Sequence, residues 1–275
     1  MFRMAKGSLL IFAAFGAFGF QTVPVHASSE CQFGTSPFVI SSDQTQTHLR
    51  WDINVQEVFW ADDSPVSGAL ADYRNWALSV ARTTSQSELI DIQRKSFVGY
   101  PNMQRRFDLV ISGQAGAIER ATCLENLLIA EHTARFPLKQ YPSEFMAFVL
   151  RDATYGSRLR IYFSSGDGKS TNYGPPVSIE ILSAVERDIE QGWIVLFHLH
   201  NHPFMLNALP DFLGGTVVPS DGDLQAYELW SQIYFLREAR ITNGFSTIRI
   251  ADTDLKMLES TVPGVSSVAG QGSRF

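Results

Sequence analysis

The stretch WIVLFHLHNHP, residues 193–203, determines the fold prediction for this 275-residue chain. It begins with an apolar run, as expected of a strand that is covered on both faces of a sheet. Successive side chains of a strand point to opposite faces, so His198, His200 and His202 share one face. The chain has six histidines in all. Half of them therefore lie on one side of a short strand, which Pro203 ends.

The segments around this strand predict a sheet with helices packed on it. Strand-like composition or alternation marks residues 48–60, 105–112, 144–152, 158–166 and 244–252. Apolar residues at helical spacing mark residues 71–84, 119–136, 177–192 and 220–239. The third of these helices has an apolar face made of Ile179, Leu182, Val185 and Ile189. The predicted fold class is therefore α/β (α+β), with a central sheet flanked by helices.

The first 27 residues predict a secretory signal peptide rather than part of the fold. Arg3 and Lys6 precede an apolar run at residues 8–20, and Val25 and Ala27 place small residues before a cleavage point. The run is shorter than the roughly 20 residues of a spanning helix, so we expect no membrane segment after cleavage. An uncleaved N-terminal anchor is the alternative. The expected location is extracytoplasmic, either periplasmic or secreted.

The two cysteines, Cys31 and Cys123, both lie beyond the predicted cleavage point. In an oxidising compartment an even number of cysteines favours a disulfide. This one would close a loop of roughly 90 residues and stabilise the fold. Two unpaired thiols are the alternative.

The charge of the chain argues against a nucleic-acid partner. The formal net charge is −6, and Lys and Arg form no cluster along the sequence. Proteins that bind nucleic acid by electrostatic attraction carry a basic patch or stripe.

The histidines of the opening stretch predict a metal site. Two imidazoles two residues apart on a strand, those of His200 and His202, can bind one small ion; zinc suits them best, with a third protein ligand and an open fourth position. Asp223, in the first turn of the helix that begins in PSDGD, is a candidate third ligand. Ser220 and Asp223 also have the spacing of a helix N-cap, which alone would explain them. Glu144, at the start of a predicted strand, is a candidate general base.

The ordered set Glu…H-x-H-P…S-x-x-D resembles the motif of the JAMM (MPN-domain) zinc metalloprotease family, and HNHP resembles its RadC-like branch. SEFMAFVLRD is similar to the first core strand of that family, and WIVLFHLHNHP to its ligand strand. The resemblance implies a JAMM/MPN-type mixed sheet in residues 140–275. It leaves residues 28–139 as an N-terminal region of unknown role.

The resemblance also implies a role for each motif residue. Zinc would be held by His200, His202 and Asp223, with water as the fourth ligand. Glu144 would act as general base, and Ser220 would donate a hydrogen bond to the oxyanion. Members of the family hydrolyse peptide or isopeptide bonds, so we expect a peptide or protein substrate. Two other functions stay open: a catalytically silent MPN-type binding module, and a periplasmic metal-binding protein that uses HLHNHP.

Two features depart from the family pattern. The segment between His202 and Ser220 is 17 residues long, which is longer than usual in the family. We expect an insertion that forms a substrate-binding lip or a lid, and it makes Asp211 and Asp221 competitors for the third ligand position. The family usually has an apolar residue in place of His198. We expect His198 to support the ligands or the core rather than to bind metal.

Overall fold

The computed structural model describes residues 31–62, 68–83, 85–169, 171, 174–205 and 214–261. The predicted signal peptide and Asp211 lie outside these residues. Among the helices that are described, none is both long enough and apolar enough to cross a membrane.

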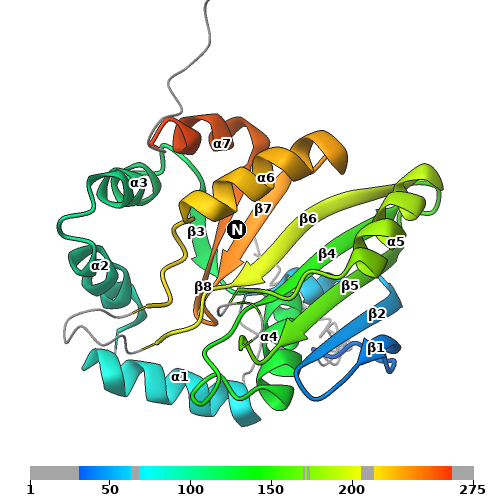
Figure 1. The fold of residues 1–275 in the computed structure, drawn as a ribbon, viewed down its shortest axis with the longest axis horizontal. Coiled ribbons are helices and arrows are strands. Elements are labelled where there is room, and N and C mark those ends of the chain that lie inside the picture. The colour runs from blue at the N-terminus through cyan, green and yellow to red at the C-terminus, as the bar shows by residue number, and fades with distance from the viewer. Residues whose placement is uncertain are drawn as a thin grey trace, which may run out of the picture.

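The described residues form one mixed sheet with helices on both faces, which confirms the predicted fold class (Figure 1). The strand order is β1-β2-β5-β4-β6-β7-β8-β3. Only the β6–β7 pair is parallel among the pairings in this sheet. The elements are β1 Phe38–Ser42, β2 Gln46–Asn54, a 3-10 turn Glu57–Trp60, α1 Gly68–Ala81, α2 Gln86–Ser96, α3 Pro101–Ile111, β3 Ala117–Arg120, α4 Cys123–Arg135, β4 Phe145–Asp152, β5 Arg158–Gly166, α5 Ile179–Glu190, β6 Trp193–Asn201, α6 Asp221–Ile233, β7 Glu238–Thr242, β8 Ser246–Ala251 and α7 Asp252–Glu259.

The sheet separates two hydrophobic cores, because alternate residues of its central strands point to opposite faces. In β4, Ala147 and Val149 pack with α1 and α4, whereas Met146 and Phe148 pack with α5, α6 and α7. Met146 is paired with His200 of β6, so His200 lies on the face that α6 covers.

The N-terminal region of unknown role contributes to the same sheet. Strands β1 and β2 extend one edge by pairing with β5, and β3 forms the opposite edge by pairing with β8. Helices α1, α2 and α3 follow one another along one side of the molecule, beside the segment that leads into α6 (Figure 1). Residues before and after position 140 are therefore joined in one sheet.

Two sequence predictions were wrong in ways that have a physical reason. Residues 105–112 were expected to form a strand but belong to helix α3, which Pro101 begins as its first residue. Phe107 and Val110 of that helix are buried at a spacing of three residues, and Arg106, which precedes Phe107, is also fully buried. In α5, Ile179 was expected on the apolar face, but its side chain is 80 % exposed and Ile181 is buried instead.

Other boundaries shifted where one predicted element proved to be two. The helix expected over residues 119–136 begins only at Cys123, after a capping box between Thr122 and Glu125, and the residues before it form β3. The helix expected over residues 220–239 ends at Ile233, and β7 follows it. Strands β4, β5 and β8 and helix α1 lie where the sequence predicted them.

The predicted disulfide is present. Cys31 and Cys123 are bonded across a separation of 92 residues. Cys123 is the first residue of α4 and is fully buried. The bond therefore fastens the start of the described chain to the core on the α4 face of the sheet.

Candidate metal centre

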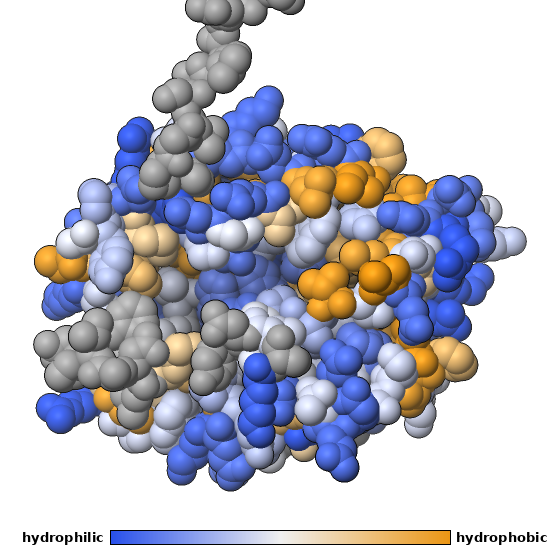
Figure 2. All heavy atoms as spheres, in the orientation of Figure 1, coloured by the Kyte–Doolittle hydropathy of each residue, from blue (hydrophilic) through white to orange (hydrophobic). Residues whose placement is uncertain are grey.

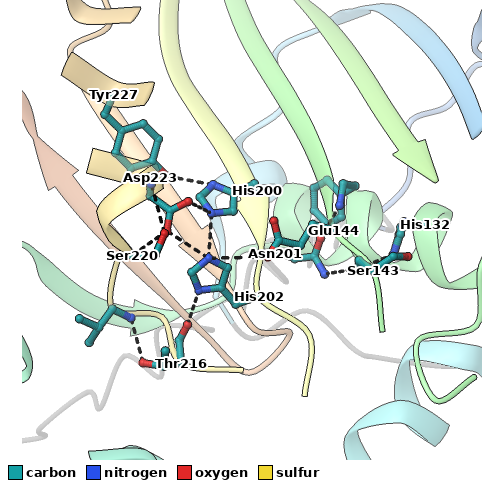
Figure 3. Close-up of polar contacts among 12 residues, drawn as sticks. His132, Ser143, Glu144, His200, Asn201, His202, Thr216, Ser220, Asp223 and Tyr227 are labelled. Atoms are coloured by element: carbon teal, nitrogen blue, oxygen red, sulfur yellow. Dashed lines mark hydrogen bonds and ion pairs between the residues drawn. The ribbon is translucent and has the colours of Figure 1, made fainter. Parts of the chain in front are cut away.

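Three elements bring the predicted site residues together (Figure 3). His200 is the second-to-last residue of β6, and His202 follows the end of that strand. The backbone N–H of His202 donates to the carbonyl of Thr242 at 2.9 Å, so the chain keeps its place beside β7. Glu144 immediately precedes β4, and Asp223 lies in the first turn of α6. In Figure 2, hydrophilic residues line a recess in the middle of the same face of the molecule.

The donor atoms of three side chains lie close to one another. His200 Nε2 and His202 Nε2 are 3.0 Å apart. Asp223 places Oδ1 at 3.2 Å from His200 Nε2 and Oδ2 at 3.3 Å from His202 Nε2. Donor atoms that bind one zinc ion at about 2.0–2.1 Å in tetrahedral geometry lie about 3.3 Å apart. The donor set and its spacing therefore fit a small tetrahedral metal ion.

Glu144 completes a candidate metal-binding group on the other side of the histidines. Glu144, His200 and His202 each offer one donor atom within 4.8 Å of the others. The distance from Glu144 Oε1 to His202 Nε2 is 3.9 Å, longer than either distance from Asp223. Asp223 is thus the carboxylate closer to the two imidazoles, and Glu144 is the more distant one.

The far nitrogens of both imidazoles are engaged, which leaves the near nitrogens for a metal. His202 Nδ1 is 2.7 Å from the carbonyl of Thr216, and His200 Nδ1 is 2.9 Å from the hydroxyl of Tyr227. A carbonyl only accepts, so Nδ1 of His202 carries the hydrogen and donates it. Such outer contacts fix the tautomer and the ring orientation of metal-binding histidines. In a neutral ring, His202 Nε2 then carries a lone pair on the side that faces His200 Nε2, where it can bind a cation.

Without a metal ion, the charges around His202 favour its protonated form. Burial alone would lower the pKa of His202, but Asp223 and Glu144 raise it to about 9. Burial would raise the pKa of Asp223, yet His200 and His202 hold it well below its usual value. A histidinium and a carboxylate therefore occupy the site at neutral pH, and a divalent cation would displace the proton.

Glu144 has the environment of a general base. Burial raises the pKa of its carboxyl, and the nearby histidines only partly offset that effect. A raised carboxyl pKa approaches the operating pH, which favours proton transfer in both directions.

Asn201, between the two histidines, fixes the backbone on both sides of Glu144. Its side chain points to the opposite face of β6 and is 2 % exposed. Asn201 Oδ1 accepts the N–H of Phe145 at 2.6 Å, and Asn201 Nδ2 donates to the carbonyl of Ser143 at 3.3 Å. His132 Nε2 lies 3.1 Å from the same carbonyl. The position of Glu144 relative to His202 is therefore set by side-chain hydrogen bonds.

Ser220 forms the helix cap that the sequence left as an alternative to a site role. Its hydroxyl accepts the N–H of Asp223 at 3.2 Å, and its own N–H donates to Asp223 Oδ2 at 2.7 Å. This capping box holds the Asp223 carboxylate at the start of α6. Asp221, a competitor for the third ligand position, instead pairs with the buried Arg106.

Three other histidines of the described residues, His48, His132 and His198, have structural environments. His198 is 1 % exposed, and neither ring nitrogen has a hydrogen-bond partner among the described residues. Its ring packs on Trp230 at 4.3 Å and on His200 at 5.7 Å between centroids, so it supports the ligand ring. His48 and His132 are buried and lie within hydrogen-bonding distance of the hydroxyls of Ser164 and Ser165.

Sequence reasoning missed three partners of the site: Asn201, Thr216 and Tyr227. Tyr227 lies four residues after Asp223 and so on the same face of α6, a spacing that a search of the sequence can detect. Asn201 was passed over because its side chain points away from the metal face. Thr216 acts through its backbone carbonyl, so no side-chain pattern marks it.

No protein-family model matches this chain, and neither a curated protein nor a solved structure does so.

Proposed function

We propose that this chain is an exported zinc-dependent peptidase of the JAMM type that hydrolyses peptide or isopeptide bonds. The observation that carries the proposal is the convergence of His200, His202 and Asp223, with donor atoms 3.0–3.3 Å apart, beside a partly buried Glu144. The Cys31–Cys123 disulfide supports export, because such bonds persist in oxidising compartments.

The residues of the site would divide the work as follows. His200, His202 and Asp223 would hold the ion, which as zinc would acidify water and polarise a carbonyl. Glu144 accepts a proton from the attacking water and passes it to the leaving amine. Ser220 uses its oxygen to accept the Asp223 N–H, so its hydroxyl hydrogen stays free to donate to the developing oxyanion.

The substitution Glu144→Gln tests the proposal. We expect zinc stoichiometry and affinity to be retained, because the closer carboxylate, Asp223, is untouched, while hydrolysis of a peptide library falls by about 10²–10⁴-fold. Asp223→Asn should instead lose zinc. Glu131→Gln, which changes a carboxylate on α4 paired with Arg135, is the matched control and should alter neither property.

The same measurements separate the other functions. If Glu144→Gln abolishes zinc binding and Asp223→Asn does not, Glu144 is the ligand and the proposed division of roles is wrong. If the wild-type chain binds zinc but cleaves no peptide in the library, a silent binding module or a metal-binding protein is the better description.

A further inference from the structure

The described residues between β6 and α6, residues 202–205 and 214–220, form what we call the flanking segment. It supplies the Thr216 carbonyl that accepts the Nδ1 hydrogen of His202 at 2.7 Å. Its two parts meet where the N–H of Gly214 donates to the carbonyl of Met205 at 3.1 Å. The path of this segment therefore decides where the partner of a metal-binding imidazole lies.

Three helices of the N-terminal region each hold the flanking segment by one polar side chain. The side chains come from α1, α2 and α3, and all of them bond to backbone groups of the segment. They are 3 %, 1 % and 0 % exposed, respectively. The contacts are Phe204 N to Tyr73 Oη at 2.8 Å, Gln93 Nε2 to Gly214 O at 3.0 Å and Arg106 Nη1 to Pro219 O at 3.2 Å.

These contacts bracket the carbonyl that bonds to His202. Thr216 lies between Gly214, held by Gln93, and Pro219, held by Arg106. Burying an amide or a guanidinium is costly unless it is hydrogen-bonded, so these side chains favour one path of the segment strongly. On the α1 side, a different path would leave the buried N–H of Phe204 without the Tyr73 hydroxyl as its acceptor, which also favours the observed path.

We propose that α1, α2 and α3 position the metal centre, with Tyr73, Gln93 and Arg106 as its positioning residues. They hold the flanking segment so that Thr216 keeps the hydrogen of His202 on Nδ1 and directs Nε2 at the ion. The proposal rests on the metal centre of the proposed function and is independent of peptide hydrolysis. It gives a role to the N-terminal region, whose described residues include none of the proposed ligands.

Zinc affinity tests the proposal in the full chain carrying Tyr73→Phe, Gln93→Leu or both. The control is Thr83→Val, because Thr83 is a buried hydroxyl between α1 and α2 that bonds to Glu88 and not to the flanking segment. We expect the double variant to bind zinc at least about 10-fold more weakly, as for other outer-contact losses. The control should keep the wild-type affinity even where urea unfolding shows a similar loss of stability.

A second measurement does not depend on zinc uptake. In spectra of ¹⁵N-histidine-labelled protein, the Nδ1 hydrogen of His202 should give a protected signal that shifts or disappears in the double variant and stays in Thr83→Val. A folded double variant with wild-type zinc affinity and an unchanged His202 signal would overturn the proposal. If the wild-type chain takes up no zinc, the proposed function fails, and the His202 signal alone then decides whether the helices position this ring.

Discussion

At the scale of single residues, Asn201 shows how a strand can serve two faces at once. Its neighbours on either side present imidazoles to the metal face, while its own amide bonds to the backbone around Glu144 on the other face. The alternation that the sequence revealed for the histidines thus also places Asn201. Which groups it would contact was not predictable, because the contacts are with backbone atoms of another strand.

Asn201→Ala should therefore affect both stability and the position of the base. It leaves the Phe145 N–H and the Ser143 carbonyl short of a partner, at a cost of about 1–3 kcal/mol in the free energy of unfolding. We expect near-normal zinc binding but a lower rate of hydrolysis and an altered pH–rate profile. The control is Asn126→Ala, which removes a buried amide on α4 that accepts a hydrogen bond from Arg74. An identical pH–rate profile in both variants would contradict a role in positioning Glu144.

The pKa of His202 predicts how the stability of the metal-free protein changes with pH. A pKa raised from 6.5 to about 9 means that the folded state binds this proton more tightly than the unfolded state. The resulting stabilisation is fully present below pH 6.5 and is lost as the pH rises through about 9. Urea unfolding with a chelator between pH 6 and 9.5 should show this decline, and His202→Gln should lack it. Parallel curves for the two proteins would disprove the assignment.

At the scale of elements, the strands and helices that the sequence predicted correctly were those with an unbroken pattern. Strand β4 is apolar over its first six residues, β5 begins with alternating polar and apolar residues, and α1 has regular helical spacing. The error at residues 105–112 arose because Phe107, Val110 and Ile111 suit a strand by composition, while the helix is fixed by packing and by Pro101 upstream. Tertiary packing therefore determined that these residues form a helix, and a local sequence pattern carries no information about such packing.

The flanking segment offers an element-scale test at Gly215. This glycine has a φ of +79°, and a Cβ there would lie 2.7 Å from the Phe204 ring. Gly215→Ala should therefore destabilise the fold by more than the strain of positive φ alone, which is about 1 kcal/mol, and should weaken zinc binding by moving Thr216. Gly156→Ala is the control, with a φ of +63° and no atom within 4 Å of the added Cβ. Equal effects of the two substitutions would show that the close packing at Phe204 is unimportant.

At the scale of the whole molecule, the sequence predicted the sheet and the disulfide, and it singled out residues that the fold brings together. It did not predict how the two halves of the chain combine. The pairings β2–β5 and β3–β8 join distant segments. Nothing in the composition of residues 46–54 or 117–120 specifies those partners. Likewise, no sequence pattern indicates which backbone atoms are hydrogen-bonded by Tyr73, Gln93 and Arg106.

The disulfide gives a prediction at this scale. Cys31 and Cys123 close a loop of 92 residues, and loss of such a constraint on the unfolded chain should cost about 4 kcal/mol in the chain-entropy model. Urea unfolding with and without a reductant measures this cost. The double variant Cys31→Ser/Cys123→Ser should unfold at the same urea concentration in both conditions. An unchanged midpoint for the reduced wild-type protein would contradict the prediction.

The edge position of β3 has a consequence for how the polypeptide matures. Ala117 pairs with Arg249 and Arg120 with Ser246, so this edge forms only after the chain has been synthesised beyond Arg249. Contacts between such distant segments slow folding, because the closure of a long loop precedes any gain from pairing. Until β8 has been synthesised, β3 lacks its partner strand, and unpaired strand edges promote aggregation. If the chain is exported as proposed, it would complete this edge of its sheet only after translocation.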